Sequence, residues 1–188
     1  MIFTETKLQG AFIIDLDKKE DSRGFFARSF CVNEFEAHGL KPTVIQCNLS
    51  FNKKKGTVRG MHYQKHPSTE TKLVRCIRGA IYDVIIDLRP ESPTYLSYIG
   101  VELTVENHRA LYVPDNFAHG FQVLADDTEI LYQMGDFYAP EYACGYRYDD
   151  PAFGIKWPLT VSEISDKDLA WSSFENVTNP QENITVTA

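Results

Sequence analysis

The sequence predicts a mostly β protein built as a β-sandwich or a jelly roll. Between residues 44 and 132 the apolar side chains fall in short runs rather than at helical spacing, and β-branched and aromatic residues are enriched in them. Gly, Pro and Asn separate the runs, as turn residues do between strands. About eight strands at such intervals are typical of these two architectures.

The expected strands follow one another with short connections. In order, their ranges are 43–51, 56–64, 71–78, 80–88, 98–104, 110–113, 120–125 and 129–136. Pro114 and Asn116 mark a turn before the seventh strand. Helix is a minor component: one short helix is expected over residues 34–38 with Asn33 as its N-cap, and another within residues 161–169.

Alternation along two strands places polar side chains together on one face. In the first strand Gln46, Asn48 and Ser50 share a face opposite apolar residues, and in the second strand His62 lies on the face opposite Arg59. One polar face alone is typical of a sheet side in water. Several such faces together fit a barrel whose wet interior holds a ligand.

Length and charge limit the classes of protein. The 188 residues, 43% of them hydrophobic, suffice for one sizeable core, so we expect a single domain over residues 1–175 and a loose tail over residues 176–188. The formal charge of −7 provides no general basic field for nucleic acid or an anionic membrane. No apolar run approaches the roughly 18 to 20 residues of a membrane helix, and the first ten residues lack signal-peptide features. We therefore expect a cytoplasmic protein.

Cysteine spacing and nucleotide motifs exclude further classes. The four cysteines form no CxxC pair, which favours reduced, buried thiols over a disulfide scaffold or a zinc site. Neither GxGxxG nor GxxxxGK[ST] is present. A phosphate group, if one is bound, must therefore be bound by side chains.

A series of short motifs runs through most of the chain. It comprises DSRGFF (21–26), QCNLS (46–50), VRGMHYQ (58–64), KLV (72–74), DVIIDLR (83–89), SPT (92–94), AHGF (118–121), IKWP (155–158) and SDKD (165–168), together with Tyr132 and Tyr138. In this order and spacing, the series resembles the dTDP-4-dehydrorhamnose 3,5-epimerase family over about residues 3 to 168.

The resemblance implies a fold and a reaction. The fold is a cupin-type jelly roll with a few short helices, which forms homodimers by strand exchange. The enzyme works without metal or redox cofactor on a nucleotide-diphosphate 4-keto-6-deoxyhexose, converting dTDP-4-dehydro-6-deoxyglucose to dTDP-4-dehydrorhamnose. The C4 ketone acidifies the hydrogens on C3 and C5, so a base removes one and the enolate is reprotonated from the opposite face.

The resemblance also assigns catalytic roles to four residues. His62 is the base, because an imidazole has a pKa near the operating pH. Asp168 holds this imidazole and stabilises its protonated form. Lys72 stabilises the enolate oxygen, and Tyr132 is the acid on the other face of the sugar.

The expected substrate contacts match the same motifs. Guanidinium groups suit phosphate oxygens, which reconciles an anionic ligand with a negatively charged protein. The residues implied are Arg23 and Arg59 for the pyrophosphate, Gln46 and Asn48 for the sugar or nucleoside, Phe26 and Tyr138 for packing on the nucleoside, and His119 for the pocket surface.

The sequence departs from the family pattern where the base is recognised. Arg28 and Ala143 stand where many members have Glu, and Tyr148 stands where most have Trp. Thymine N3–H needs an acceptor, and arginine has only donors. A 3-only or 5-only epimerase, acting on a dTDP, CDP or UDP sugar, is therefore an open alternative.

Two other classes remain for comparison. A metal-dependent cupin would use His62, His119 and Glu70 around iron, manganese or zinc. Metal cupins usually carry His-x-His on the first strand, however, and here Gln64 takes the second position, with Lys72 an unfavourable neighbour for a dication. A non-catalytic carbohydrate-binding jelly roll is disfavoured because all four catalytic residues named above are present.

Overall fold

The computed structural model describes residues 1–174, which form thirteen strands and three short helical segments. The strands are β1 Ile2–Glu5, β2 Phe12–Asp15, β3 Lys19–Asp21, β4 Gly24–Phe26, β5 Gln46–Asn52, β6 Val58–Gln64, β7 Lys72–Arg78, β8 Ala80–Asp87, β9 Tyr98–Thr104, β10 Ala110–Val113, β11 Phe117–Val123, β12 Thr128–Met134 and β13 Ala143–Gly145. The helical segments are α1 Val32–Ala37, the 3₁₀ turn η1 Pro140–Tyr142 and α2 Asp166–Leu169. The expected tail lies outside the described residues.

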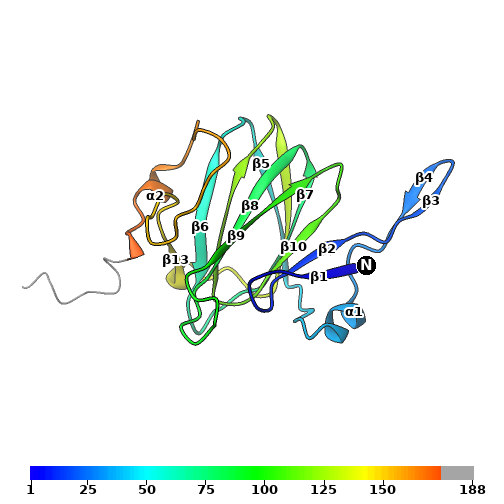
Figure 1. Ribbon diagram of the computed structural model, residues 1–188, viewed down its shortest axis with the longest axis horizontal. Coiled ribbons are helices and arrows are strands. Elements are labelled where there is room, and N and C mark those ends of the chain that lie inside the picture. The colour runs from blue at the N-terminus through cyan, green and yellow to red at the C-terminus, as the bar shows by residue number, and fades with distance from the viewer. Residues whose placement is uncertain (175–188) are drawn as a thin grey trace, which may run out of the picture.

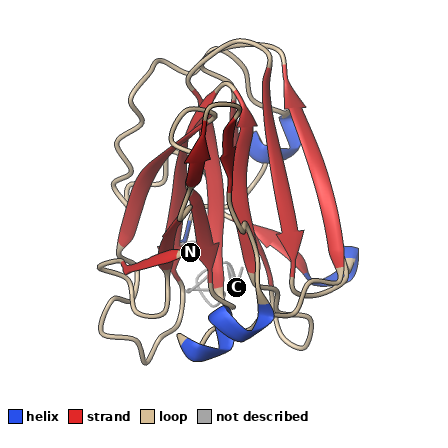
Figure 2. Cartoon of the chain, turned by 90° about the vertical axis from the view of Figure 1, so that its right-hand side faces the viewer, coloured by secondary structure: helices blue, strands red, loops and turns tan. Residues whose placement is uncertain are grey.

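Two antiparallel sheets pack face to face (Figures 1 and 2). One sheet has six strands in the order β1-β2-β10-β7-β12-β5, and the other has five in the order β13-β6-β11-β8-β9. Strands β3 and β4 form a separate two-stranded hairpin. This arrangement confirms the mostly β, cupin-type jelly roll with few helices.

The observed elements agree with the sequence over the middle of the chain. All eight expected strands are present, and β9 and β10 have the expected bounds. The predicted N-cap was wrong: α1 begins at Val32, so Asn33 lies within the helix, and Cys31, with extended backbone angles, caps it. Strands β1 to β4 and β13 were missed; each has only three or four residues, and sequence analysis found no run of β-branched and aromatic residues bounded by turn residues there.

The main core lies between the two sheets. Buried residues such as Val74 and Leu111 on the six-stranded sheet pack with Ile85 and Phe121 on the five-stranded sheet. The outer face of the five-stranded sheet is covered by the segment from residue 146 to residue 174, which packs Tyr146 and other aromatic residues on the sheet. Both faces of that sheet are therefore buried.

The outer face of the six-stranded sheet is covered only in part. Helix α1 packs buried Phe35 in a cluster with Phe12 of β2 and Leu73 of β7. Farther along the sheet, Leu49 and Phe51 of β5 remain 61% and 44% exposed. An apolar strip on β5, on the residue before it and on β7 therefore faces outward, and we call it the open face. It consists of Ile45, Cys47, Leu49, Phe51 and Ile77.

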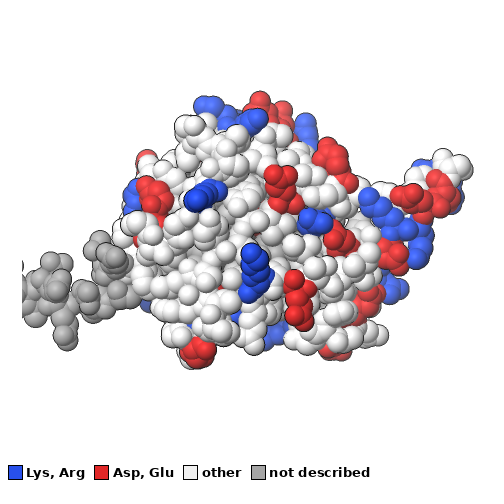
Figure 3. Space-filling model, viewed as in Figure 1, with Lys and Arg blue, Asp and Glu red and all other residues white. Residues whose placement is uncertain are grey.

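The β3–β4 hairpin extends away from the two sheets (Figure 1). Figure 3 shows basic and acidic side chains side by side on and near it. Arg23 at its turn forms an ion pair with Asp21, at 2.6 Å between Nη2 and Oδ2, and its side chain is 88% exposed. Phe26 at its end is 79% exposed. The hairpin thus presents an arginine and an aromatic ring to the surroundings.

No helix within residues 1–174 is long and apolar enough to cross a bilayer.

Candidate active site

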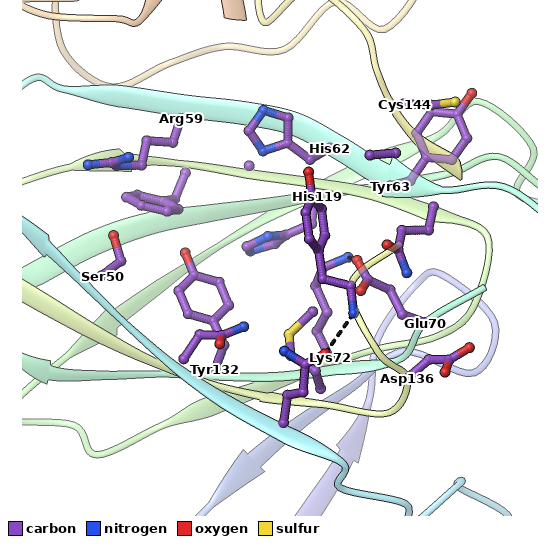
Figure 4. Close-up of a pocket in the computed structure, with 18 of the residues that line it drawn as sticks. Ser50, Arg59, His62, Tyr63, Glu70, Lys72, His119, Tyr132, Asp136 and Cys144 are labelled. Atoms are coloured by element: carbon purple, nitrogen blue, oxygen red, sulfur yellow. Dashed lines mark hydrogen bonds and ion pairs between the residues drawn. The ribbon is translucent and has the colours of Figure 1, made fainter. Parts of the chain in front are cut away.

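A cavity of about 330 Å³ opens between the two sheets, and side chains from both of them line it (Figure 4). Strands β5, β7 and β12 of the six-stranded sheet form one wall, and β6 and β11 of the other sheet form the opposite wall. Eight of the residues expected to be catalytic or to bind substrate line it: Gln46, Asn48, Arg59, His62, Lys72, His119, Tyr132 and Tyr138. The polar face of β5 therefore points inward, and its apolar face forms part of the open face.

A register shift in β6 brings Arg59 and His62 into the same cavity. Strict alternation predicts these two side chains on opposite faces, and this prediction was wrong. His62 pairs with His119 of β11 and Arg59 pairs with Phe121, so three steps along β6 match two steps along β11. Such a bulge re-aims a side chain, and both residues line the cavity as a result.

His62 and Asp168 form a hydrogen-bonded pair. The Nε2 atom of His62 lies 2.6 Å from Oδ1 of Asp168. The Asp168 side chain is buried whereas that of His62 is 44% exposed, so the imidazole is the member of the pair that reaches the cavity. Burial of Asp168 favours the neutral carboxyl, but the hydrogen bond and charge of His62 outweigh it and lower the pKa of Asp168. The carboxylate therefore stays ionised beside the ring.

Local structure positions Asp168 although it lies 106 residues from His62. Ser165 is the N-cap of α2, and its side-chain oxygen accepts a hydrogen bond from the backbone N–H of Asp168 at 3.1 Å. The backbone N–H of Gly60 donates to Oδ2 of Asp168 at 3.4 Å. Capping of a short helix thus fixes the carboxylate behind the imidazole.

Tyr132 stands on the wall opposite His62. It comes from β12 of the six-stranded sheet, whereas His62 comes from β6 of the five-stranded sheet, and both line the cavity. Burial raises the pKa of the Tyr132 phenol well above its usual value, and the nearby charge of Asp83 acts in the same direction. The phenol is therefore protonated at neutral pH and can donate a proton.

Two residues that line the cavity, Lys72 and His119, each contact a buried carboxylate. Nζ of Lys72 lies 2.6 Å from Oε1 of Glu70, with both side chains less than a tenth exposed. Nε2 of His119 lies 2.7 Å from Oδ1 of Asp83, which is fully buried. Burial raises the pKa of Asp83, and His119 and Lys72 oppose this shift. The His119 ring also packs edge-on against Tyr132, with 5.9 Å between ring centroids.

Arg59 is held by a neutral partner. Its Nε donates to Oδ1 of Asn52 at 2.7 Å, and Asn52 is buried. Within residues 1–174, no carboxylate lies within ion-pair distance of the Arg59 guanidinium. Its positive charge is therefore left for an anionic ligand.

Two glutamines hold the loop that carries Tyr138 at the rim of the cavity. Oε1 of Gln46 accepts a hydrogen bond from the backbone N–H of Tyr138 at 2.6 Å. Gln64 is buried, its Oε1 accepts from the N–H of Ala139 at 2.7 Å, and its Nε2 donates to the carbonyl of Phe137 at 3.1 Å. Gln46, expected as a substrate contact, thus also anchors this loop.

Several residues singled out from the sequence lie elsewhere in the chain. Arg23 and Phe26 are on the hairpin and do not line the cavity. Arg28 forms an ion pair with Glu34 at 2.9 Å, whereas Ala143 does line the cavity. Tyr148 lies near Trp157, with 6.5 Å between ring centroids.

Sequence reasoning missed other lining residues. They are Tyr63, Gln64, Glu70, Gly120, Phe121, Met134, Asp136, Ala143, Cys144, Lys167 and Trp171, some of them noted only for other reasons. Ser50 also lines the cavity, in agreement with its place on the predicted polar face of β5. Lys167 could have been predicted from the sequence, because it adjoins Asp168 in the SDKD motif. Trp171 could not have been predicted, because its indole reaches the cavity only through the path of the C-terminal segment. Its ring centroid lies 6.2 Å from that of His62.

The residues required by the metal-cupin alternative do not gather at one point. His62 pairs with Asp168, His119 with Asp83, and Glu70 with Lys72. Within residues 1–174, no three His, Cys, Asp or Glu side chains form a cluster suited to a metal ion. The donor set therefore favours proton transfer by side chains.

A jelly roll whose cavity holds a base–carboxylate pair on one wall and a protonated phenol on the other belongs to the acid–base isomerases. Comparison with known proteins defines the class further. The family model described as dTDP-4-dehydrorhamnose 3,5-epimerase matches residues 5–176. The chain therefore belongs to the dTDP-4-dehydrorhamnose 3,5-epimerase family and is an epimerase.

Individual relatives cover nearly the whole chain. The dTDP-4-dehydrorhamnose 3,5-epimerase of Methanothermobacter thermautotrophicus is 42% identical over 172 residues, which are 90% of this chain and 92% of that protein. The crystal structure of the enzyme from Elizabethkingia anophelis matches with a TM-score of 0.91 at 34% identity, covering 94% of this chain and 97% of that one. The Legionella pneumophila enzyme in complex with dTDP-4-keto-L-rhamnose matches with a TM-score of 0.85 at 37% identity, covering 92% of each chain.

Proposed function

We propose that this epimerase inverts C3 and C5 of dTDP-4-dehydro-6-deoxyglucose and so forms dTDP-4-dehydrorhamnose. The observation that carries the proposal is the placement of His62, backed by Asp168, and Tyr132 on facing walls of one cavity. A sugar ring between these walls has a base on one face and an acid on the other. The names of the relatives and the dTDP-sugar bound to the Legionella enzyme support the choice of substrate.

Each inversion requires one proton to leave and one to arrive. The bond between His62 Nε2 and Asp168 leaves Nδ1 as the nitrogen that accepts the proton from C3 or C5. The electron pair of that C–H bond moves toward the C4 oxygen, where the Lys72 ammonium stabilises the enolate. Tyr132 then donates its proton to the carbon from the opposite face. Because each step moves only a proton, the reaction calls for neither a metal nor a redox cofactor.

The nucleotide part of the substrate is bound by side chains. Arg59 supports this assignment because its guanidinium has a neutral amide partner and lines the cavity. Tyr138 at the rim is 57% exposed and can pack on a nucleoside. A charged nucleotide sugar does not cross a bilayer unaided, which favours the cytoplasm, where nucleotides are made, as the place of action.

We further propose that the working enzyme is a homodimer in which the hairpin of one protomer completes the cavity of its partner. Arg23 and Phe26 lie on a hairpin that extends away from their own cavity. The open face supplies a second reason, because an exposed apolar strip on a folded sheet is typical of an interaction site. Strand exchange between two protomers would cover this strip. It would also bring Arg23 and Phe26 of each protomer to the cavity of its partner.

Isotope exchange tests the proposed reaction. The protein is incubated with dTDP-4-keto-6-deoxyglucose in deuterated water, and the sugar is analysed by NMR and mass spectrometry. We expect deuterium at both C3 and C5, and His62→Ala as a folded control should reduce the rate at both carbons by about 10²–10⁴-fold. No incorporation with folded wild-type protein would contradict the proposal. Incorporation at one carbon alone would identify a single-site epimerase. Parallel reactions with CDP and UDP sugars test which nucleotide the enzyme requires on the sugar.

A further inference from the structure

The cavity contains a carboxylate, that of Glu70, which takes no direct part in the proposed proton transfers. Glu70 lies two residues before Lys72, and an extended chain places residues i and i+2 on the same side. Their charged ends meet at 2.6 Å, with side chains 8% and 7% exposed (Figure 4). Glu70 is the sole carboxylate within ion-pair distance of Lys72 among residues 1–174.

Lys72 needs a partner to stay in place. Its four-carbon stem is flexible, and a buried ammonium is unfavourable unless a charge compensates it. Nζ of Lys72 makes no hydrogen bond to the described part of the chain, so the contact with Glu70 is an attraction between charges. A lysine held in this way is free to direct its N–H groups at a ligand atom.

A second carboxylate lies close enough to Lys72 for their charges to interact. Asp83 is fully buried on β8, its Oδ2 has no hydrogen-bond partner among residues 1–174, and its pKa responds to the charge of Lys72. Without Glu70, this carboxylate is the anion toward which Lys72 would turn. Such a movement takes the ammonium from the sugar carbonyl and also disturbs the pair of Asp83 with His119.

We propose that Glu70 is a positioning residue that holds the Lys72 ammonium at the substrate carbonyl and away from Asp83. This inference rests on the proposed function, because it takes the enolate oxygen as the group that Lys72 meets. Glu70 itself touches no reacting atom. Its effect is therefore expected on turnover, with little effect on binding of the nucleotide.

The first test compares three variants. Glu70→Gln keeps the shape and removes the charge, and we expect a loss in kcat of about 10-fold or more with KM changed less than about 3-fold. Glu70→Asp keeps the charge on a shorter side chain and should recover part of the loss. Glu129→Gln is the matched control, since Glu129 forms an exposed ion pair with Arg78 at 3.9 Å on the same sheet. It should leave kcat and KM unchanged.

A double-mutant cycle separates positioning from general stability. If Glu70 acts through Lys72, then Glu70→Gln in a Lys72→Met background should change kcat less than about 2-fold. The double variant removes both charges and leaves no unpaired buried ion. Its comparison with Lys72→Met therefore still tests the proposal if Glu70→Gln alone folds poorly. A further loss of about 10-fold in this background would overturn the proposal.

Crystal structures give a readout independent of turnover. In Glu70→Gln we expect Nζ of Lys72 to lie closer to Asp83 than in the wild type. An unmoved Nζ, or wild-type kcat in folded Glu70→Gln, would overturn the inference. Wild-type protein that exchanges no deuterium with any nucleotide sugar would contradict the proposed function, whereas the position of Nζ would still decide the role of Glu70.

Discussion

Charged side chains around the cavity occur mainly as pairs, and this determines which charges are left for a ligand. Lys72 contacts the carboxylate of Glu70, so its charge is locally balanced, and the rings of His62 and His119 each lie within hydrogen-bond distance of a carboxylate. Such pairing keeps charges tolerable in a buried site. Arg59 differs because an amide holds it, and its full positive charge faces the cavity. This distribution fits a ligand whose anionic part binds at Arg59 and whose neutral sugar lies among the paired groups.

The carboxylate behind His62 provides the first prediction. Asp168→Asn retains a hydrogen-bonding side chain but removes the charge that stabilises the protonated imidazole. We expect kcat to fall by about 10²–10⁴-fold, as in other base-and-orienter pairs, with the affinity for dTDP unchanged. Steady-state kinetics and calorimetric titration with dTDP measure the two quantities. Activity within about 3-fold of wild type would show that the imidazole works without this partner.

At the scale of elements, one buried aspartate anchors the loop that follows β8. Asp87 accepts hydrogen bonds from Arg89, from Ser92 Oγ at 2.5 Å and from Thr94 Oγ1 at 2.7 Å. Burial raises the pKa of Asp87, but these hydrogen bonds outweigh it and lower the pKa to about 2 from 3.8. The ionised carboxylate therefore stabilises the folded state.

The lowered pKa of Asp87 predicts how stability depends on pH. Because the folded pKa lies below the unfolded one, the contribution is fully present above about pH 4 and is lost as the pH falls toward 2, and it amounts to about 2 kcal/mol. Asp87→Asn should reduce the free energy of unfolding by about this amount at pH 7. Urea denaturation at several pH values measures it. The difference between variant and wild type should shrink below pH 4, and a constant difference would contradict the assigned pKa.

The buried glutamine of β6 gives a second prediction at this scale. Gln64→Ala removes the hydrogen bonds to Phe137 and Ala139, which frees the loop that carries Tyr138. We expect KM for the nucleotide sugar to rise by about 10-fold with a smaller change in kcat, because in the proposed binding mode the rim contacts the nucleoside and the proton transfers take place deeper in the cavity. Gln9→Ala, at an exposed position, is the control. A fall in kcat at constant KM would place Gln64 in the chemistry instead.

Sequence reasoning predicted the long strands well because they contain enough residues to show a period. The polar face of β5 pointed to a wet interior, and Gln46 and Asn48 line the cavity. Alternation failed for Arg59 because the bulge in β6 depends on pairing with β11, a contact distant in sequence. The arrival of Trp171 at the cavity likewise depends on packing of a distant segment, which a linear pattern does not encode.

At the scale of the whole molecule, the two sheets are unequally covered. The C-terminal segment covers the five-stranded sheet, and α1 covers only part of the six-stranded sheet. The open face, and Arg23 and Phe26 on the hairpin, are exposed in the described chain. Both support a dimer in which each cavity draws residues from two protomers.

Subunit mixing tests whether Arg23 serves the cavity of the partner. Arg23→Ala and His62→Ala are each expected to be nearly inactive. After random exchange of equal amounts, half of the dimers contain both variants, and each of these has one complete site if Arg23 acts across the interface. The mixture should then regain about a quarter of wild-type activity in a turnover assay. A mixture as inactive as its components would place Arg23 in the cavity of its own chain.

The extra residue of β6 has a consequence for protein engineering. Since it lets one strand present Arg59 and His62, the proposed phosphate-binding and catalytic residues, to a single cavity, the bulge between positions 59 and 62 matters as much as the identity of these residues. A regular strand with the same two residues between these positions would turn Arg59 toward the covered side of the sheet. Redesign of this stretch must therefore preserve the bulge.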